Sequence, residues 1–153
     1  MRFMGLDVGG VRIGVAVSDE TGLIARRLVT LQRTGGRQDF EALSTLIVEN
    51  DAGHVVVGHP VNMDGSQGQQ AERIHEFVER LQAVTSTPIS LWDERLSSWS
   101  AEQVLIESGM RRAKRKQVID QMAAVIILQS FLDHHNGTAG GLAVFSTENH
   151  GRK

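Results

Sequence analysis

The 153-residue chain has room for one domain and is large enough to bury most of the apolar surface of its unfolded form. Its composition, 41% hydrophobic and 22% charged, is ordinary for a soluble globular protein, and its formal net charge is only −2. This charge excludes a general attraction to nucleic acid, so any such affinity must come from a local basic patch. Cysteine is absent, which excludes disulfides and thiolate metal sites.

The N-terminus runs directly into a strand pattern, without the basic segment and apolar stretch of a signal peptide. No apolar run approaches the ~18 residues that would indicate a membrane span. We therefore expect a cytoplasmic protein with no membrane partner.

The first thirty residues predict three strands. Apolar residues alternate with other residues over 4–8 and 11–17, and Gly9-Gly10 between them can supply the positive φ that a tight hairpin needs. The third strand, from Ile24 to Leu31, is more polar, so we expect it nearer an edge of the sheet.

Helices and strands then alternate along the chain. Apolar residues at helical spacing predict a helix over about 37–50, and the apolar run 55–57 is typical of a buried parallel strand. The polar stretch 60–68 is a predicted loop. A helix follows it and stops before Pro88, and residues 89–92 form the last predicted strand.

Two helices are predicted after the last strand. Ser100 can cap a short helix that carries Val104 and ends at Gly109. After a basic run over 111–116, a longer helix is predicted from Gln117 to about His134.

This order of elements indicates the α/β class. A hairpin followed by strand–helix–strand crossovers predicts a mixed sheet with helices on both faces. No internal repeat or long linker divides the chain, so residues 1–135 are expected to form the domain. The tail 136–153 is Gly-rich and polar, and we expect it to be flexible.

Three acids stand where a strand or a helix can present them to one metal site. Asp7 lies near the end of the first strand, Glu94 follows the last strand, and Asp120 opens the long helix. An ionised carboxylate in apolar sequence is costly unless it has a partner, and a cation is a natural one. The three acids therefore predict a site in which Mg²⁺ or Mn²⁺ serves phosphate chemistry.

The first two acids also have structural interpretations. Asp7 can accept hydrogen bonds from the backbone of Gly9-Gly10, as turn aspartates do. Glu94 and its neighbour Asp93 can form an exposed acidic pair, with Arg95 as a weak surface partner. Adjacent strand residues point to opposite sides, so only one of the two acids can face Asp7.

Asp120 has two interpretations as well. An acid in the first turn of a helix is favoured by the macrodipole. Alternatively, the small side chains of Ala123 and Ala124, which share its face of the helix, let the helix lie close to the sheet and bring Asp120 near the first strand.

Several cations adjoin these acids and are candidate substrate ligands. Arg12 faces out of the second strand, where it can contact phosphate or simply be a solvated strand residue, and Arg95 directly follows Glu94. The basic run before Asp120 consists of Arg111, Arg112, Lys114, Arg115 and Lys116 around one alanine. Its contacts with phosphates would be independent of sequence and strongly sensitive to salt, although such runs are commonly solvated surface.

Four segments together resemble the YqgF family, the RuvC-like branch of the ribonuclease H-like superfamily. They are 7–16, 57–60 with 64–66, 93–98, and 120–124 with 127–129, in order and at family-like spacing. The chain departs from the family pattern at His59, where leucine is usual, and at Ser97-Ser98, where threonines are usual.

The resemblance implies a ribonuclease H-like fold with a five-stranded mixed sheet, and a catalytic and metal-binding trio of Asp7, Glu94 and Asp120. It also implies a metal-dependent nuclease, described in the family as a pre-16S rRNA nuclease or as Holliday junction resolvase-like. The expected substrate is structured RNA such as pre-rRNA, in association with the ribosome, with branched DNA as the alternative. Either a monomer or a homodimer fits this description.

Two further functions compete with nuclease activity. The Asp-x-Gly hairpin resembles the phosphate loop of actin-like ATPases, but those proteins enclose ATP between two such domains and this chain has the length of one. A non-catalytic RNA- or ribosome-binding module would use the basic run alone. The substitution Asp7→Asn distinguishes a nuclease from a binding module, since it should abolish cleavage by a nuclease and leave nucleic-acid binding intact or improved.

Overall fold

The computed structural model of the chain describes residues 1–60, 68–96 and 105–137. Its elements are β1 (Arg2–Val8), β2 (Arg12–Ser18), β3 (Ala25–Gln32), α1 (Arg37–Glu49), β4 (Ala52–His59), α2 (Gln69–Gln82), β5 (Ile89–Asp93) and α4 (Arg112–His135). The predictions for the loop 61–67, Ser97-Ser98, Ser100, Val104 and the tail 138–153 lie outside the described residues. None of the helices in the described ranges has the length and apolar character required to cross a bilayer.

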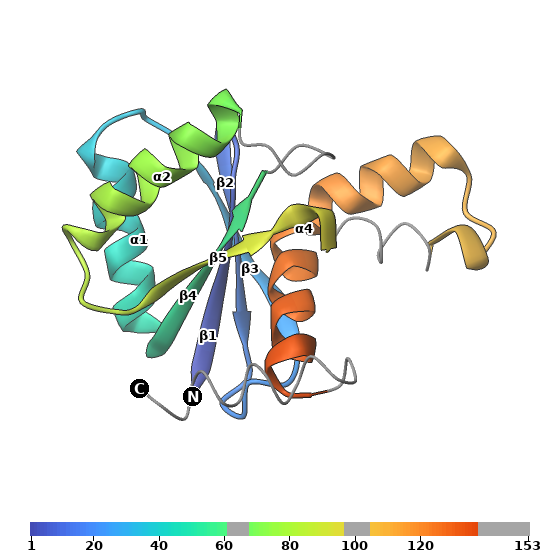
Figure 1. Cartoon of the computed structure of the whole chain (residues 1–153), viewed down its shortest axis with the longest axis horizontal. Coiled ribbons are helices and arrows are strands. Elements are labelled where there is room, and N and C mark those ends of the chain that lie inside the picture. The colour runs from blue at the N-terminus through green and yellow to red at the C-terminus, as the bar shows by residue number, and fades with distance from the viewer. Residues whose placement is uncertain (61–67, 97–104, 138–153) are drawn as a thin grey trace.

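The five strands form one mixed sheet in the order β3-β2-β1-β4-β5. The β1–β2 and β2–β3 pairs are antiparallel, whereas β4 runs parallel to both β1 and β5. Helices α1 and α2 lie on one face of the sheet and α4 lies on the other (Figure 1). The predicted α/β architecture is confirmed, and β3 lies at an edge, as its polar sequence indicated.

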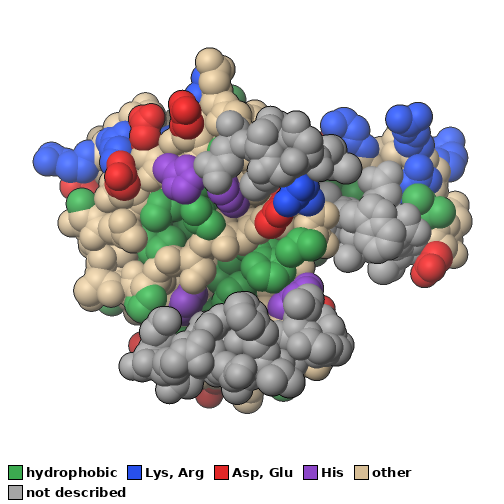
Figure 2. Space-filling model, in the orientation of Figure 1, with side chains coloured by type: hydrophobic (Ala, Val, Ile, Leu, Met, Phe, Trp, Pro, Cys, Tyr) green, Lys and Arg blue, Asp and Glu red, His purple; other side chains and the backbone are tan. Residues whose placement is uncertain are grey.

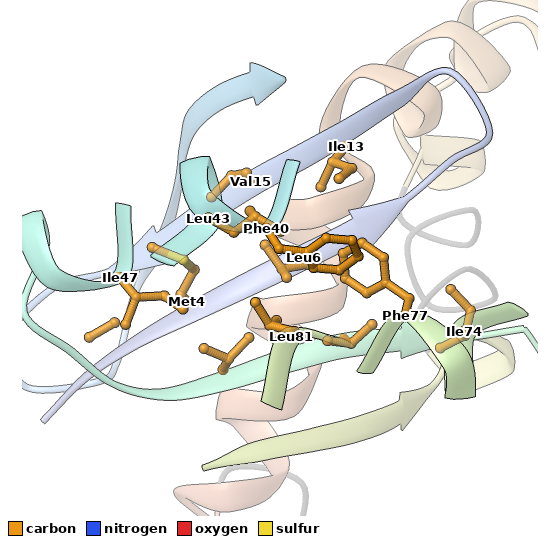
Figure 3. Packing of buried hydrophobic residues seen from close by; sticks show 13 residues of the cluster. Met4, Leu6, Ile13, Val15, Phe40, Leu43, Ile47, Ile74, Phe77 and Leu81 are labelled. Carbon is orange, nitrogen blue, oxygen red and sulfur yellow. The ribbon is translucent and has the colours of Figure 1, made fainter. Parts of the chain in front are cut away.

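Alternation along the strands divides the core into two clusters, one on each face. Met4 and Leu6 of β1 pack against α1 and α2, where the rings of Phe40 and Phe77 lie beside Leu6 (Figure 3). Phe3 of β1 points the other way, into the cluster with α4. Because Asp7 has the same parity as Phe3, this pattern directs its side chain to the α4 face.

The helix α4 begins at Arg112, five residues before the predicted start at Gln117, so the basic run after Arg111 is part of the helix. Its first turns are exposed and project away from the sheet, whereas its second half packs on the sheet through Ala124, Leu128 and Leu132 (Figure 1). Asp120 is therefore the ninth residue of the helix. The macrodipole interpretation of this acid is wrong, because the dipole favours acids only in the first turn.

The β1–β2 connection differs from the predicted hairpin. Neither Gly9 nor Gly10 has a positive φ. Instead, Gly9 N–H donates to the Arg12 carbonyl at 2.8 Å, and a Cβ on Gly9 would lie only 2.9 Å from that oxygen. Glycine is needed here for a close backbone approach rather than for a left-handed conformation.

Candidate functional site

A cleft of about 780 Å³ opens at the carboxyl end of β1, on the face of the sheet that α4 covers. All three predicted acids line it, from β1, from the residue after β5 and from α4. This end of the parallel strands is where open α/β sheets bind ligands. We call it the acidic cleft, after Asp7, Glu94 and Asp120.

Asp7 lines the acidic cleft and pairs with Gly14 of β2. A Cβ added to Gly14 would lie 3.7 Å from the Asp7 Cβ and 3.6 Å from the Ala124 Cβ, so the helix passes close beside the acid. In the described ranges the Asp7 carboxylate accepts no hydrogen bond, so the turn interpretation is wrong. Burial raises the pKa of Asp7, and the negative charge of Asp120 raises it further.

Glu94 reaches the acidic cleft across Gly58 of β4. A Cβ on Gly58 would lie 2.7 Å from Glu94 Oε1 and 2.6 Å from Ile127 Cδ1, so only glycine leaves room for the carboxylate beneath α4. Burial, followed by the charges of Asp7 and Asp93, raises the pKa of Glu94 to about 7. A carboxylate crowded in this way gains from any bound cation.

Asp93 faces away from this cleft, as the alternation of adjacent residues requires. Its carboxylate accepts bonds from the backbone N–H of Arg95 at 2.9 Å and from the Arg95 guanidinium at 2.6 Å. The side-chain hydrogen bond from Arg95 is the main reason that the pKa of Asp93 is lowered. Glu94 is thus the member of the acidic pair that faces Asp7, and Arg95, a predicted substrate ligand, is bound to Asp93.

Asp120 is the least enclosed of the three acids. Its side chain is 65% exposed, and it lies 3.8 Å from Lys116 one turn earlier in α4. Such an exposed pair contributes little stability. The small Ala124 is buried against Gly5 of β1, as the sequence predicted, and this packing brings Asp120 close enough for its charge to raise the pKa of Asp7.

The acids do not form a complete metal cage by themselves. In residues 1–60, 68–96 and 105–137, no three His, Cys, Asp or Glu side chains are grouped closely enough to hold one ion. The structure brings Asp7 and Glu94 together and leaves Asp120 on the wall of the same cleft. The assignment of the three acids as catalytic and metal-binding residues stays a prediction.

The predicted cations lie in two places. Arg12 is exposed and lines the acidic cleft beside Asp7. Arg111, Arg112, Lys114 and Lys116 are exposed on or beside the projecting turns of α4, where Lys and Arg side chains gather on the surface (Figure 2). Arg115 differs, because its guanidinium donates to the Met110 carbonyl at 2.7 Å and it is partly buried.

Other cations were missed at the level of sequence. Arg27 of β3 also lines the acidic cleft, with its guanidinium on the Thr30 hydroxyl at 3.0 Å. Arg33, Arg73 and Arg80 line a neighbouring hollow against α1 and α2. Isolated arginines on a strand or a helix carry no distinctive pattern, and only the folded arrangement brings these together.

Comparison with curated proteins gives relatives across most of the chain. A protein of Thermoanaerobacter pseudethanolicus named "Putative pre-16S rRNA nuclease" is 51% identical over 134 residues, covering 87% of this chain and 96% of the relative. A protein of Myxococcus xanthus with the same name is 48% identical over 135 residues, covering 88% and 89%.

Solved structures give the same fold. The structure titled "T. thermophilus RuvC in complex with Holliday junction substrate" matches with a TM-score of 0.57 at 14% identity, covering 93% of this chain and 97% of that one. Identity this low shows the fold alone, and it confirms the predicted ribonuclease H-like architecture. The sequence model described as "RuvX: Holliday junction resolvase" matches residues 1–134, and the chain therefore belongs to the RuvX family.

Proposed function

We propose that this protein is a metal-dependent nuclease that processes the 5′ end of pre-16S rRNA in the cytoplasm. Its family and its curated relatives support nuclease activity, and the names of those relatives support this substrate. One structural observation carries the chemistry: Asp7 of β1 and Glu94, which directly follows β5, line one cleft with Asp120, and the charge of Asp7 raises the pKa of Glu94.

The residues present fit a magnesium ion. Mg²⁺ keeps several of its waters and is commonly held by one or two carboxylates together with substrate phosphates, so it needs no complete protein cage. Asp7 and Glu94 would hold it, with Asp120 as a further oxygen ligand. When bound, such an ion supplies an activated water and stabilises charge on the oxygens of an in-line displacement.

The side chains around the acids have separate tasks in this proposal. Arg12 and the exposed cations of α4 hold the phosphates that flank the scissile one, which orients the strand without selecting a sequence. Gly58, which has no side chain, leaves the space that the Glu94 carboxylate occupies beside Ile127 of α4.

The test is a cleavage assay with pre-16S rRNA ends in the presence of Mg²⁺ or Mn²⁺. We expect cleavage by the wild type and a loss of at least about a hundredfold in rate for Asp7→Asn, because a metal ligand contributes several kcal/mol in the transition state. RNA binding by this variant should be retained. The matched control is Asp51→Asn, an exposed acid before β4 at the opposite end of that strand, which should cleave as the wild type does.

An absence of metal-dependent cleavage of any structured RNA or branched DNA, with RNA binding present, would instead make the protein a binding module. The assay therefore includes four-way DNA junctions, because the family model carries the resolvase description. Resolution of a two-fold junction requires two active sites, so light scattering should then give the mass of a homodimer. Cleavage of the rRNA precursor alone, by a monomer, would favour the first substrate.

A further inference from the structure

A second cleft, of about 400 Å³, lies on the opposite face of β1 from the acidic cleft, between the sheet and the helices α1 and α2. Three arginines line it, and we call it the arginine cleft: Arg33, Arg73 and Arg80. The two clefts have four lining residues in common, and they therefore meet at the acids: Asp7, Gly9, Gly10 and Glu94.

Two of the arginines are held above aromatic rings. The rings of Phe40 and Phe77 pack together (Figure 3), with their centroids 4.9 Å apart. Both residues line the arginine cleft. The Arg80 guanidinium lies 4.5 Å from the centroid of Phe40, and that of Arg33 lies 5.6 Å from the centroid of Phe77. Cations that are already ordered in this way lose less entropy when they bind an anion.

Two arginines of the arginine cleft, Arg73 and Arg80, are available to bind an anion. In the described part of the chain, Arg73 has no hydrogen bond and no ion pair, and Arg80 has only its contact with Phe40. Glu76 also lines the cleft, one turn from each of them, but none of the ion pairs between described residues joins it to either arginine. The other two acids of the lining, Asp7 and Glu94, lie at the boundary with the acidic cleft.

Among the described residues, no side chain separates the two clefts where Gly9 and Gly10 form their boundary. Gly9 and Gly10 are exposed and carry no side chain, and a Cβ on Gly10 would meet no atom within 4 Å. Arg33 binds this boundary directly, because its guanidinium donates to the Gly9 carbonyl at 2.9 Å. A strand whose scissile phosphate lies at the acids can therefore continue across the two glycines into the arginine cleft.

We propose that the arginine cleft is a subsite for the nucleotide next to the scissile phosphate, with its own phosphate on Arg73 and Arg80. The strand then leaves the acids in two directions, over the glycines into this cleft and along the acidic cleft toward the basic turns of α4. The cleft has room for about one nucleotide, and guanidinium groups recognise the phosphate rather than the base. This inference rests on the proposed nuclease function, because it takes Asp7 and Glu94 as the point of cleavage.

The test measures binding of a short, labelled single-stranded oligoribonucleotide by fluorescence anisotropy in chelator, so that no cleavage intervenes. The variants are Arg73→Gln, Arg80→Gln and their combination. The matched control is the double variant Arg26→Gln/Arg37→Gln, which removes two exposed arginines that line neither cleft. Thermal denaturation checks that Arg80→Gln, which leaves Phe40 uncovered, still folds; Arg73→Gln has no contact to lose and tests the subsite in any case.

We expect the double cleft variant to bind about tenfold more weakly than the wild type, the amount that one or two charged hydrogen bonds contribute. Its salt dependence should be less steep by about 0.7 for each lost phosphate contact. Binding within twofold of the wild type, or an equal loss in the control, would overturn the subsite.

A cleavage assay with the same variants separates this inference from the proposed function. Cleavage by the wild type, together with unchanged binding and unchanged KM in the cleft variants, would refute the subsite and leave the nuclease intact. Arginine-dependent binding without cleavage by the wild type would support the cleft as a nucleotide site and refute the nuclease.

Discussion

The environment of Glu94 makes its ionised form unfavourable in the folded protein, and a bound cation would offset this cost. Its carboxylate is partly buried and lies beside the charge of Asp7, and its pKa is raised to about 7 from an ordinary value of 4.5. A raised pKa means that the folded protein holds this proton more tightly than the unfolded chain does. The ionised form is therefore strained in the metal-free protein.

The stability of the metal-free protein should fall as pH rises from about 4.5 to about 7 through this group. Below that window both the folded and the unfolded chain are protonated at Glu94, whereas within it only the folded chain is, so unfolding releases a proton. The full cost, on the order of 3 kcal/mol, is present above pH 7. In Glu94→Gln this pH-dependent change in the free energy of unfolding should be absent. Denaturant titrations in chelator across this pH range measure the free energy of unfolding of both proteins.

Magnesium should reverse the difference in stability between the wild type and Glu94→Gln. At pH 7.5 in chelator, Glu94→Gln should be more stable than the wild type, and millimolar Mg²⁺ should stabilise only the wild type by mass action. The exposed variant Glu79→Gln of α2 is the matched control and should follow the wild type. Equal pH dependence in all three proteins would contradict the crowding of Glu94.

At the scale of elements, two glycines determine how closely α4 approaches the sheet. A Cβ on Gly5 of β1 would lie 2.7 Å from the Leu128 Cβ and 3.1 Å from the Ala124 carbonyl. Gly58 has the same role one strand away, where it makes room for Glu94 and Ile127. The acidic cleft therefore depends on a helix that rests directly on strand backbone.

The substitution Gly5→Ala should destabilise the protein by about 1–3 kcal/mol, since the added methyl forces the helix outward. Chemical denaturation measures this change. The matched control is Gly10→Ala, where the new methyl meets no atom within 4 Å and the backbone has no positive φ, so stability should be nearly unchanged. If Gly5→Ala were as stable as the control, the close packing of α4 would not be a determinant of the fold.

The start of α4 shows what apolar periodicity detects and what it misses. Arg, Lys and Ala are strong helix formers, but residues 112–116 have no apolar stripe, because most of these side chains are exposed to solvent. Periodicity finds only the face of a helix that is buried. It therefore located the second half of α4 and placed its start too late.

The sequence predicted the parts of the candidate site that are marked by a local sequence pattern, and it missed the parts that only the folded arrangement brings together. Asp7 lies near the carboxyl end of β1 and Glu94 directly follows β5, and the parallel arrangement of β1, β4 and β5 brings these strand ends to one edge of the sheet. The arginine cleft has no such signal, because Arg33 and Arg73 are forty residues apart and meet only through packing of α2 on the sheet.

At the scale of the whole molecule, the net charge of −2 is the sum of cations and acids that lie in different regions of the surface. Exposed cations gather on the projecting turns of α4, while three acids line the cleft behind them. The protein as a whole does not attract a polyanion, so its affinity for nucleic acid must come from these local cations and must be screened by salt.

We therefore expect that removing cations from α4 lowers the salt dependence of RNA affinity more than removing the same number of cations elsewhere. The double variant Arg112→Gln/Lys114→Gln should lower the slope of log affinity against log salt by about 1.4 for single-stranded RNA, since each phosphate contact contributes about 0.7. The variant Arg26→Gln/Arg37→Gln makes the same change in net charge on β3 and α1 and should leave the slope unchanged. Anisotropy titrations at several salt concentrations compare the two. If both variants lowered the slope equally, affinity would follow total charge, and the projecting turns of α4 would have no special part in binding.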